Sequence, residues 1–401
     1  MKLLLTLALT AATAAQAAAQ APQTPKRLIV GFKADVDAAR QAELLGRFGL
    51  SDVEALDVLN ARVVEAPTGA FQPAAVRLMA DPAVYYVEED FYTNWLNAAA
   101  PVSFSQVPLP DMAAIMAELP KFEQKTAASG ELPWGIVRVN AQGAWARGVD
   151  GRGVKVAVID TGIDCKHPDL AANCAGGYNA IDSNKPPMDD NSHGTHVAGT
   201  IAAVKDGKGV VGVAPAARLY AVKVLDGEGG GSLTSIIKGI VWAGRNGMQV
   251  ANMSLGAPVG SVFMRLAVTY AKSKGVAILA AAGNSGGSVG YPAAYEDTIA
   301  VAAADSSDKL ADFSSRGKQV DFIAPGVDVE SSVPGGKYDR YSGTSMATPH
   351  MTGLAALAVQ QGASGKDAVM AALRRAAKPL ASLKPEEQGV GMPDAGLILG
   401  K

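Results

Sequence analysis

Three polar side chains stand in sequence settings that suit nucleophilic catalysis. Asp160 ends the apolar run VKVAVID, His193 lies in NSHGTHVAGT, and Ser345 lies in YSGTSMATPHMTGLAALAV. Hydrolysis of a peptide bond at neutral pH requires a nucleophile, a base that takes its proton, a group that orients the base, and donors for the developing oxyanion. A serine, a histidine and an aspartate have the chemistry of the first three roles.

Each of these residues, taken alone, also has an ordinary structural interpretation. Asp160 could cap the turn after its strand, His193 could be a satisfied surface residue, and Ser345 could cap the Ala- and Leu-rich helix that follows it. Pro349 fits the first turn of that helix, where proline is tolerated. A serine at that helix start would lie beside free backbone N–H groups and the positive end of the helix dipole.

Together, in the order Asp, His, Ser, the three motifs resemble the subtilisin family. Segments that extend the resemblance beyond Gly130 include PWGIVRVNA, HPDL, GVAPAARLYAVKVL, ANMSLG, AAGNSG, FSSRG and IAPG. The resemblance implies that Ser345 is the nucleophile, His193 the general base and later acid, and Asp160 the residue that fixes the imidazole. It implies a secreted serine endopeptidase that works through an acyl-enzyme and requires no cofactor for the chemistry.

The same resemblance assigns an oxyanion-hole amide and a substrate site. Asn284, in AAGNSG, matches the amide that works beside the backbone N–H of Ser345. The residues that match the pocket walls and the strand-pairing segment carry no charge, which predicts a preference for apolar or aromatic P1 side chains. They are Ser254, Leu255 and Gly256 in one wall, Ala281, Ala282 and Gly283 in the other, and Gly229 to Leu233 along the upstream substrate.

A structural calcium site is a further implication of the resemblance. Asp169 and the loop VKDGKGV at 204–210, which contains Asp206, match the family's calcium site in position and loop length. Calcium takes oxygen ligands of this kind. Gly130 stands where the family has a side-chain amide, and two lysines bring positive charge to the loop, so an ordinary turn rich in Gly and Asp is the alternative.

The chain has two cysteines, Cys165 and Cys174, which lie nine positions apart. In an oxidising compartment such a pair predicts a disulfide that closes a small loop. Two reduced, buried thiols are the alternative.

Two regular patterns of secondary structure lie on either side of an Ala-, Pro- and Ser-rich linker. Residues 27–90 predict the order βαββαβ of a small ferredoxin-like sandwich, with helices at 38–48 and 71–80. After Pro133, the apolar strands VKVAVI, RLYAVKV, MQVANMS, GVAILAAAG and TIAVAA alternate with helices. That alternation predicts an α/β fold, a parallel sheet with helices on both faces. Ligands of such sheets bind beyond the carboxyl ends of the strands, where Asp160, Asn252 and Asn284 fall.

The N-terminal domain, with its VEED ending, resembles the family's propeptide. The resemblance implies a folding assistant and intramolecular inhibitor that self-cleavage releases. We therefore expect a signal peptide at 1–21, a propeptide at 22–92, a linker at 93–130 with at most a short helix near 112–119, and the catalytic domain at 131–401. The processing cut is expected between residues 97 and 131.

The composition narrows the partners and the compartment. A net charge of −2 gives no basic field for nucleic acid. The first 21 residues place one lysine before an apolar run and small residues that fit A-x-A cleavage, which predicts a signal peptide. A membrane anchor is the alternative, but the apolar run at 3–9 is far shorter than the ~20 residues of a spanning helix.

We therefore expect an extracellular or periplasmic monomer that acts on proteins and peptides, with no nucleic-acid partner and no membrane association after signal removal. Two other readings share the fold. One is a catalytically inactive binding or inhibitory module, which the presence of all four chemical roles disfavours. The other is a sedolisin-type acid peptidase, whose base is a carboxylate, and His193 and Asn284 argue against it.

Overall fold

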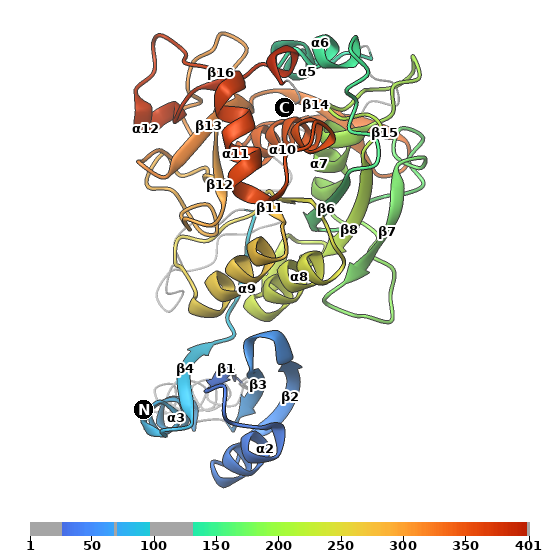
Figure 1. Ribbon diagram of the computed structural model, residues 1–401. Coiled ribbons are helices and arrows are strands. Elements are labelled where there is room, and N and C mark those ends of the chain that lie inside the picture. The colour runs from blue at the N-terminus through green and yellow to red at the C-terminus, as the bar shows by residue number, and fades with distance from the viewer. Residues whose placement is uncertain (1–25, 68–69, 97–130, 399–401) are drawn as a thin grey trace, which may run out of the picture. The chain divides into compact units, whose positions relative to one another are not determined.

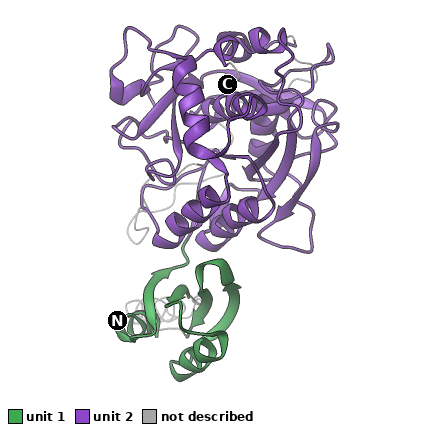
Figure 2. Cartoon of the chain, in the orientation of Figure 1, with its two compact units in different colours: residues 1–91 green, residues 92–401 purple. Residues whose placement is uncertain are grey.

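The structure, a computed structural model, describes residues 26–67, 70–96 and 131–398. The chain divides into two compact units, residues 1–91 and residues 92–401 (Figure 2). The predicted signal peptide lies outside the described residues, as do residues 97–130, which contain most of the predicted linker and its short helix.

The N-terminal unit has the predicted order of elements. They are β1 (Lys26–Phe32), α2 (Ala38–Arg47), β2 (Ser51–Leu56), the short η1 (Asp57–Leu59), β3 (Ala61–Ala66), α3 (Phe71–Ala80) and β4 (Val84–Glu89). The strands form an antiparallel sheet in the order β2-β3-β1-β4. Leu28, Val30 and Phe32 alternate along β1 and share one core with Leu44 and Leu45 of α2. This period-two pattern against a helix explains why the segment folds as a sandwich.

A seven-stranded parallel sheet forms the centre of the C-terminal unit, in the order β13-β12-β11-β10-β6-β8-β7 (Figure 1). The five predicted strands are present as β6 (Lys155–Asp160), β8 (Arg218–Lys223), β10 (Val250–Met253), β11 (Ala277–Ala281) and β12 (Ile299–Ala304). The two edge strands, β7 (Cys174–Asn179) and β13 (Val320–Pro325), were not predicted. β10, β11 and β12 are buried along their whole length, which accounts for their continuous apolar sequences.

Helices lie on both sides of this sheet, with α8 (Leu233–Arg245) and α9 (Val262–Ser273) on one side and α7 (His193–Ala202) and α10 (Thr344–Gln360) on the other (Figure 1). The side chains of Ser232 and Ser261 accept backbone N–H bonds and cap α8 and α9. Helix α10 is buried from Thr344 through Ala358, so it has no polar face. No helix of the described part of the chain is long and apolar enough to cross a membrane.

Shorter elements surround this core. They are β5 (Tyr92–Asn94), α5 (Trp134–Arg138), α6 (Ala141–Trp145), β9 (Gly230–Ser232), β14 (Val329–Val333), β15 (Lys337–Tyr341), α11 (Gly365–Ala376), β16 (Ala377–Lys378), α12 (Pro385–Gln388), β17 (Met392–Pro393) and η2 (Ala395–Leu397). Strand β5 falls in the stretch for which the sequence predicts the end of the propeptide and the start of the linker. It belongs to the C-terminal unit and pairs antiparallel with β9.

Candidate active site

The three candidate catalytic residues lie at element ends in the C-terminal unit. Asp160 is the last residue of β6, His193 the first residue of α7, and Ser345 the second residue of α10. Nδ1 of His193 lies 2.8 Å from Oδ1 of Asp160. The Asp160 carboxylate therefore lies at the carboxyl end of an interior strand, as the sequence predicts.

Burial and charge act in opposite directions on the His193 imidazole. Its side chain is 13 % exposed, and the Asp160 carboxylate that faces it is fully buried. Burial alone lowers the pKa of His193, but the charge and hydrogen bond of Asp160, with a smaller contribution from the charge of Asp189, outweigh it and raise the pKa above its ordinary value. The imidazole is thereby held in a state ready to accept a proton.

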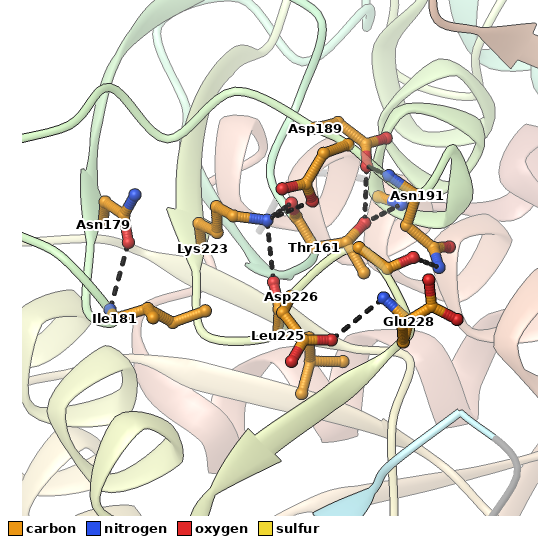
Figure 3. Close-up of polar contacts among 12 residues, drawn as sticks. Thr161, Asn179, Ile181, Asp189, Asn191, Lys223, Leu225, Asp226 and Glu228 are labelled. Carbon is orange, nitrogen blue, oxygen red and sulfur yellow. Dashed lines mark hydrogen bonds and ion pairs between the residues drawn. The ribbon is translucent and has the colours of Figure 1, made fainter.

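A second buried carboxylate, Asp189, fixes the backbone that enters α7. Its Oδ1 accepts hydrogen bonds from the Thr161 hydroxyl and from the N–H groups of Asn191 and Ser192, and its Oδ2 accepts from the N–H and hydroxyl of Thr195. Figure 3 shows Asp189 beside Thr161 and Asn191. The sequence analysis missed this residue. An aspartate that precedes a helix start by a few positions was the available signal.

Ser345 is held against strand β10 by a chain of buried polar groups. The Thr352 hydroxyl donates to Asn252 (2.8 Å), the Asn252 amide donates to the Ser254 hydroxyl (2.9 Å), and that hydroxyl donates to the Ser345 carbonyl (2.8 Å). The Ser345 hydroxyl itself donates to the Ser254 carbonyl at 3.0 Å. In this rotamer its proton is directed at Ser254 rather than at His193.

The Asn284 side chain has a fixed orientation. Its Oδ1 accepts two hydrogen bonds from Thr344, one from the backbone N–H and one from the hydroxyl, each 2.8 Å long. With the carbonyl oxygen engaged, the amide nitrogen is the end left to act as a donor. The backbone N–H of Ser345 is a further available donor, because the first N–H groups of a helix have no intrahelical partner. Thr344 is a second residue that sequence reasoning missed.

A cavity of about 360 Å³ joins Asn284 and Ser345 to the predicted pocket walls. Leu255 and Gly256 line it on one side and Ala281 and Gly283 on the other. None of the described residues that line it carries a charge. Of the other residues predicted to contact substrate, Ser254 and Ala282 are fully buried, and Leu233 is buried at the start of α8.

The residues after β4 occupy this same site. In the antiparallel pairing of β5 with β9, Tyr92, Thr93 and Asn94 lie opposite Ser232, Gly231 and Gly230. Trp95 continues the pattern, since its N–H donates to the Gly229 carbonyl and its carbonyl accepts from the Gly256 N–H, both at 3.0 Å. Trp95 and Leu96 line the cavity with Ser345. An extended segment of this chain thus lies between the two segments that the sequence assigned to substrate.

The predicted calcium ligand Asp169 contacts the 204–210 loop, which contains Asp206. Asp169 is buried, its oxygens accept from the Val210 N–H (2.9 Å) and the Tyr338 hydroxyl (3.2 Å), and burial raises its pKa, to which the charge of Asp206 adds. Gly130 lies outside the described residues, but the side chain of its neighbour Glu131 accepts from the Gly207 N–H at 2.8 Å. No cluster of three or more His, Cys, Asp or Glu side chains suited to a metal occurs in the described ranges.

Cys165 and Cys174 form a disulfide, with Cα atoms 5.7 Å apart. The loop that it closes contains the fully buried His167 and the buried Asp169. Nδ1 of His167 accepts from the Asp169 N–H, and Nε2 lies 3.0 Å from the Lys337 carbonyl. The disulfide therefore closes a loop in which the His167 and Asp169 side chains are buried and hydrogen-bonded.

Comparison with known proteins identifies two regions of the chain. Residues 151–391 match the subtilase family model, and residues 10–90 match the fervidolysin N-terminal prodomain. Subtilisin E of Bacillus subtilis strain 168 is 43 % identical over 343 residues, which cover 83 % of this chain and 80 % of the relative. M-protease of Shouchella clausii is 52 % identical over 240 residues (60 % and 62 %), and Subtilisin Savinase of Lederbergia lenta is 53 % identical over 234 residues (58 % and 86 %).

The family match extends over more than half of the chain and contains Asp160, His193 and Ser345. The prodomain match ends at residue 90, one residue after the end of β4. The identity to Subtilisin E extends across both regions. The chain is therefore a serine endopeptidase of the subtilase family that carries an N-terminal prodomain.

Proposed function

We propose that Asp160, His193 and Ser345 form the catalytic triad of this peptidase. The observation that carries the proposal is the 2.8 Å contact between His193 Nδ1 and the buried Asp160 carboxylate, because it leaves Nε2 as the acceptor of a proton. For attack, the Ser345 hydroxyl turns from the Ser254 carbonyl toward Nε2. His193 takes the hydroxyl proton as Ser345 Oγ attacks the scissile carbonyl, and it gives that proton to the amine that leaves as the acyl-enzyme forms. A water molecule then gives a proton to His193 and attacks the acyl-enzyme, and the proton returns to Ser345 as the acid product leaves.

Asn284 and the Ser345 backbone N–H stabilise the oxyanion in this mechanism. Thr344 holds the carbonyl end of Asn284, so the amide is aligned before substrate arrives. Such preorganised donors stabilise charge that develops in the transition state without reorganisation. The uncharged cavity supports apolar or aromatic P1 side chains, a preference that can be measured with peptide anilides that differ only at P1.

The test compares the wild-type chain with Ser345→Ala, expressed in a host that lacks other exported proteases. The wild type is expected to shorten on a gel and to digest casein, whereas the variant stays full length and inactive. A variant that matures and digests casein like the wild type would contradict the assignment of Ser345.

We propose further that the enzyme is made as a zymogen whose own residues 92–96 occupy the substrate site. The support is the strand pairing of β5 with β9 and the bonds of Trp95 to Gly229 and Gly256, which are the contacts an extended substrate makes by strand addition. Leu96 and Ser345 line one cavity, and an extended chain advances only ~3.3 Å per residue. The first cut therefore falls within the next few residues, at the N-terminal end of the range that the sequence predicts.

N-terminal sequencing of the first product in a maturation time course tests this. We expect the new N-terminus between residues 97 and 99. A first product that begins near Glu131 would contradict the placement while leaving the triad untouched.

A structural calcium ion at Asp169 and Asp206 is also proposed. The proposal rests on two carboxylates. Burial disfavours the charged form of Asp169, and the negative charge of Asp206 disfavours it further. A bound divalent cation would offset both effects. Backbone carbonyls of the 204–210 loop would complete the oxygen set. The ion stabilises the fold and supplies nothing to the chemistry. Melting of Ser345→Ala with calcium and with a chelator tests it, and equal melting temperatures would contradict it.

Export from the cytoplasm is proposed from the N-terminal signal-like sequence. Recovery of casein-digesting activity outside the cytoplasm, lost when residues 1–21 are deleted, checks this location.

A further inference from the structure

Lys223, the last residue of β8, has a buried side chain in the middle of the active-site loops. It lies opposite Asp160 in the neighbouring strand, and its side chain is 7 % exposed. Its Nζ donates to the Thr161 carbonyl (2.7 Å), the Leu225 carbonyl (2.8 Å) and the Asp190 carboxylate (2.6 Å), as Figure 3 shows in part. An ammonium group has three donors, so all of them are used.

The three acceptors belong to three different parts of the proposed site. Thr161 follows the carboxylate that orients the base, and Asp190 stands three positions before His193. Leu225 begins the segment that leads to residues 229–232, along which residues 92–95 pair. One buried ammonium therefore joins the Asp160 turn, the His193 loop and the wall that binds extended peptide.

One further contact connects the His193 loop to that wall, and two others shape the wall itself. The side-chain amide of Asn191 donates to the Gly227 carbonyl at 2.8 Å. The Asp226 carboxylate accepts from the N–H groups of Glu228 (2.9 Å) and Gly230 (3.0 Å), which shapes the turn before β9 (Figure 3). Lys223 contacts both sides of this network. It donates to the carbonyl of Leu225, the residue directly before Asp226, and to the carboxylate of Asp190, the residue directly before Asn191.

We propose that Lys223 is a positioning residue, which sets the distance between the substrate wall and the catalytic base. An extended peptide fixes its backbone on residues 229–231, and its scissile bond then meets His193 and Ser345 only if the wall and the His193 loop keep their spacing. Small misplacements of a reacting group are costly in rate, by up to about 10²-fold for ~1 Å. The inference rests on the proposed triad and substrate wall.

The role predicts an effect that loss of stability alone does not produce. A tetrapeptide anilide reaches the wall, whereas an anilide of a single blocked residue with the same P1 side chain does not. Loss of Lys223 should therefore reduce kcat/KM for the long substrate more than for the short one. A smaller folded fraction lowers both values equally and leaves their ratio unchanged.

The experiment measures this ratio in the matured wild type, Lys223→Met, Asp190→Asn and a control, Lys272→Met. Lys272 also pairs with a carboxylate, Asp297 at 2.8 Å, but on helix α9 and with its side chain 33 % exposed. Asp190→Asn retains the lysine and its two carbonyl acceptors. Titration of Ser345 with phenylmethanesulfonyl fluoride counts the active sites.

We expect the ratio to fall by about tenfold in Lys223→Met and by about threefold in Asp190→Asn, with the control unchanged. Ratios in both site variants that stay within about twofold of wild type overturn the proposal, as does an equal fall in Lys272→Met. If Lys223→Met does not mature, the ratio of Asp190→Asn decides alone. A wild type that cleaves neither substrate instead refutes the proposed function.

Discussion

The disulfide between Cys165 and Cys174 offers a stability prediction whose size follows from the length of the loop. The two cysteines are nine positions apart, so the closed loop holds about ten residues, for which the chain-entropy relation gives about 2.7 kcal/mol at 25 °C. In a domain of this size each kcal/mol shifts Tm by about 2–4 °C. Replacement of both cysteines by serine should therefore lower Tm by roughly 5–10 °C.

The measurement is calorimetry on Ser345→Ala, in which self-digestion does not compete with unfolding. Reductant provides the matched control, because it should lower the Tm of the parent to that of the double serine variant and leave that variant unaffected. A double variant that melts within about 1 °C of the parent would refute the reasoning, since the loop would then be fixed entirely by its buried contacts. Those contacts, made by His167 and Asp169, remain in both proteins.

Four shorter predictions concern the site and the buried histidines. Asn284→Ala should lower kcat with little change in KM; in subtilisin, loss of the corresponding amide costs about 10²–10³ in kcat, and a loss below about tenfold would argue against its role. Because the pKa of His193 is raised and the base must be neutral, kcat/KM should rise with pH across a range above about 6.5, and a plateau already reached below that value would contradict this. Brief peroxide treatment should lower activity through Met346, which is buried directly beside Ser345, and full retention would contradict that placement. Burial lowers the pKa of His196 to about 3 and of His350 to about 4, so the unfolded chain binds protons more readily and Tm should fall as pH drops from about 6.5, as calorimetry of Ser345→Ala can test.

The sequence predicts the centre of the sheet better than its edges. β10, β11 and β12 are buried on both faces, so their apolar runs stand out. The edge strand β7 has the sequence CAGGYN and is partly exposed, so it has neither an apolar run nor a clean alternation. This segment forms a strand because it pairs with β8, and the local sequence does not indicate that pairing.

The site shows the same division. Asp160, His193 and Asn284 could be named because each lies in a sequence motif that resembles the family, and the first two lie at element ends. Thr344 and Lys223 could not, because their roles arise from partners on other elements, such as the Asn284 side chain for Thr344 and the Thr161 carbonyl for Lys223. Such contacts form between elements that are far apart in the sequence, so no local sequence pattern indicates them.

The strand contributed by residues 92–96 has a consequence for when the enzyme can act. In the proposed zymogen, this strand competes with outside peptides as part of the same molecule for as long as the chain is uncut. Dilution does not weaken an intramolecular competitor, so inhibition of the uncut molecule does not depend on protein concentration. A single cut turns it into a separate ligand that dilution can release. The activity of the cut enzyme then depends on how far the released segment is diluted.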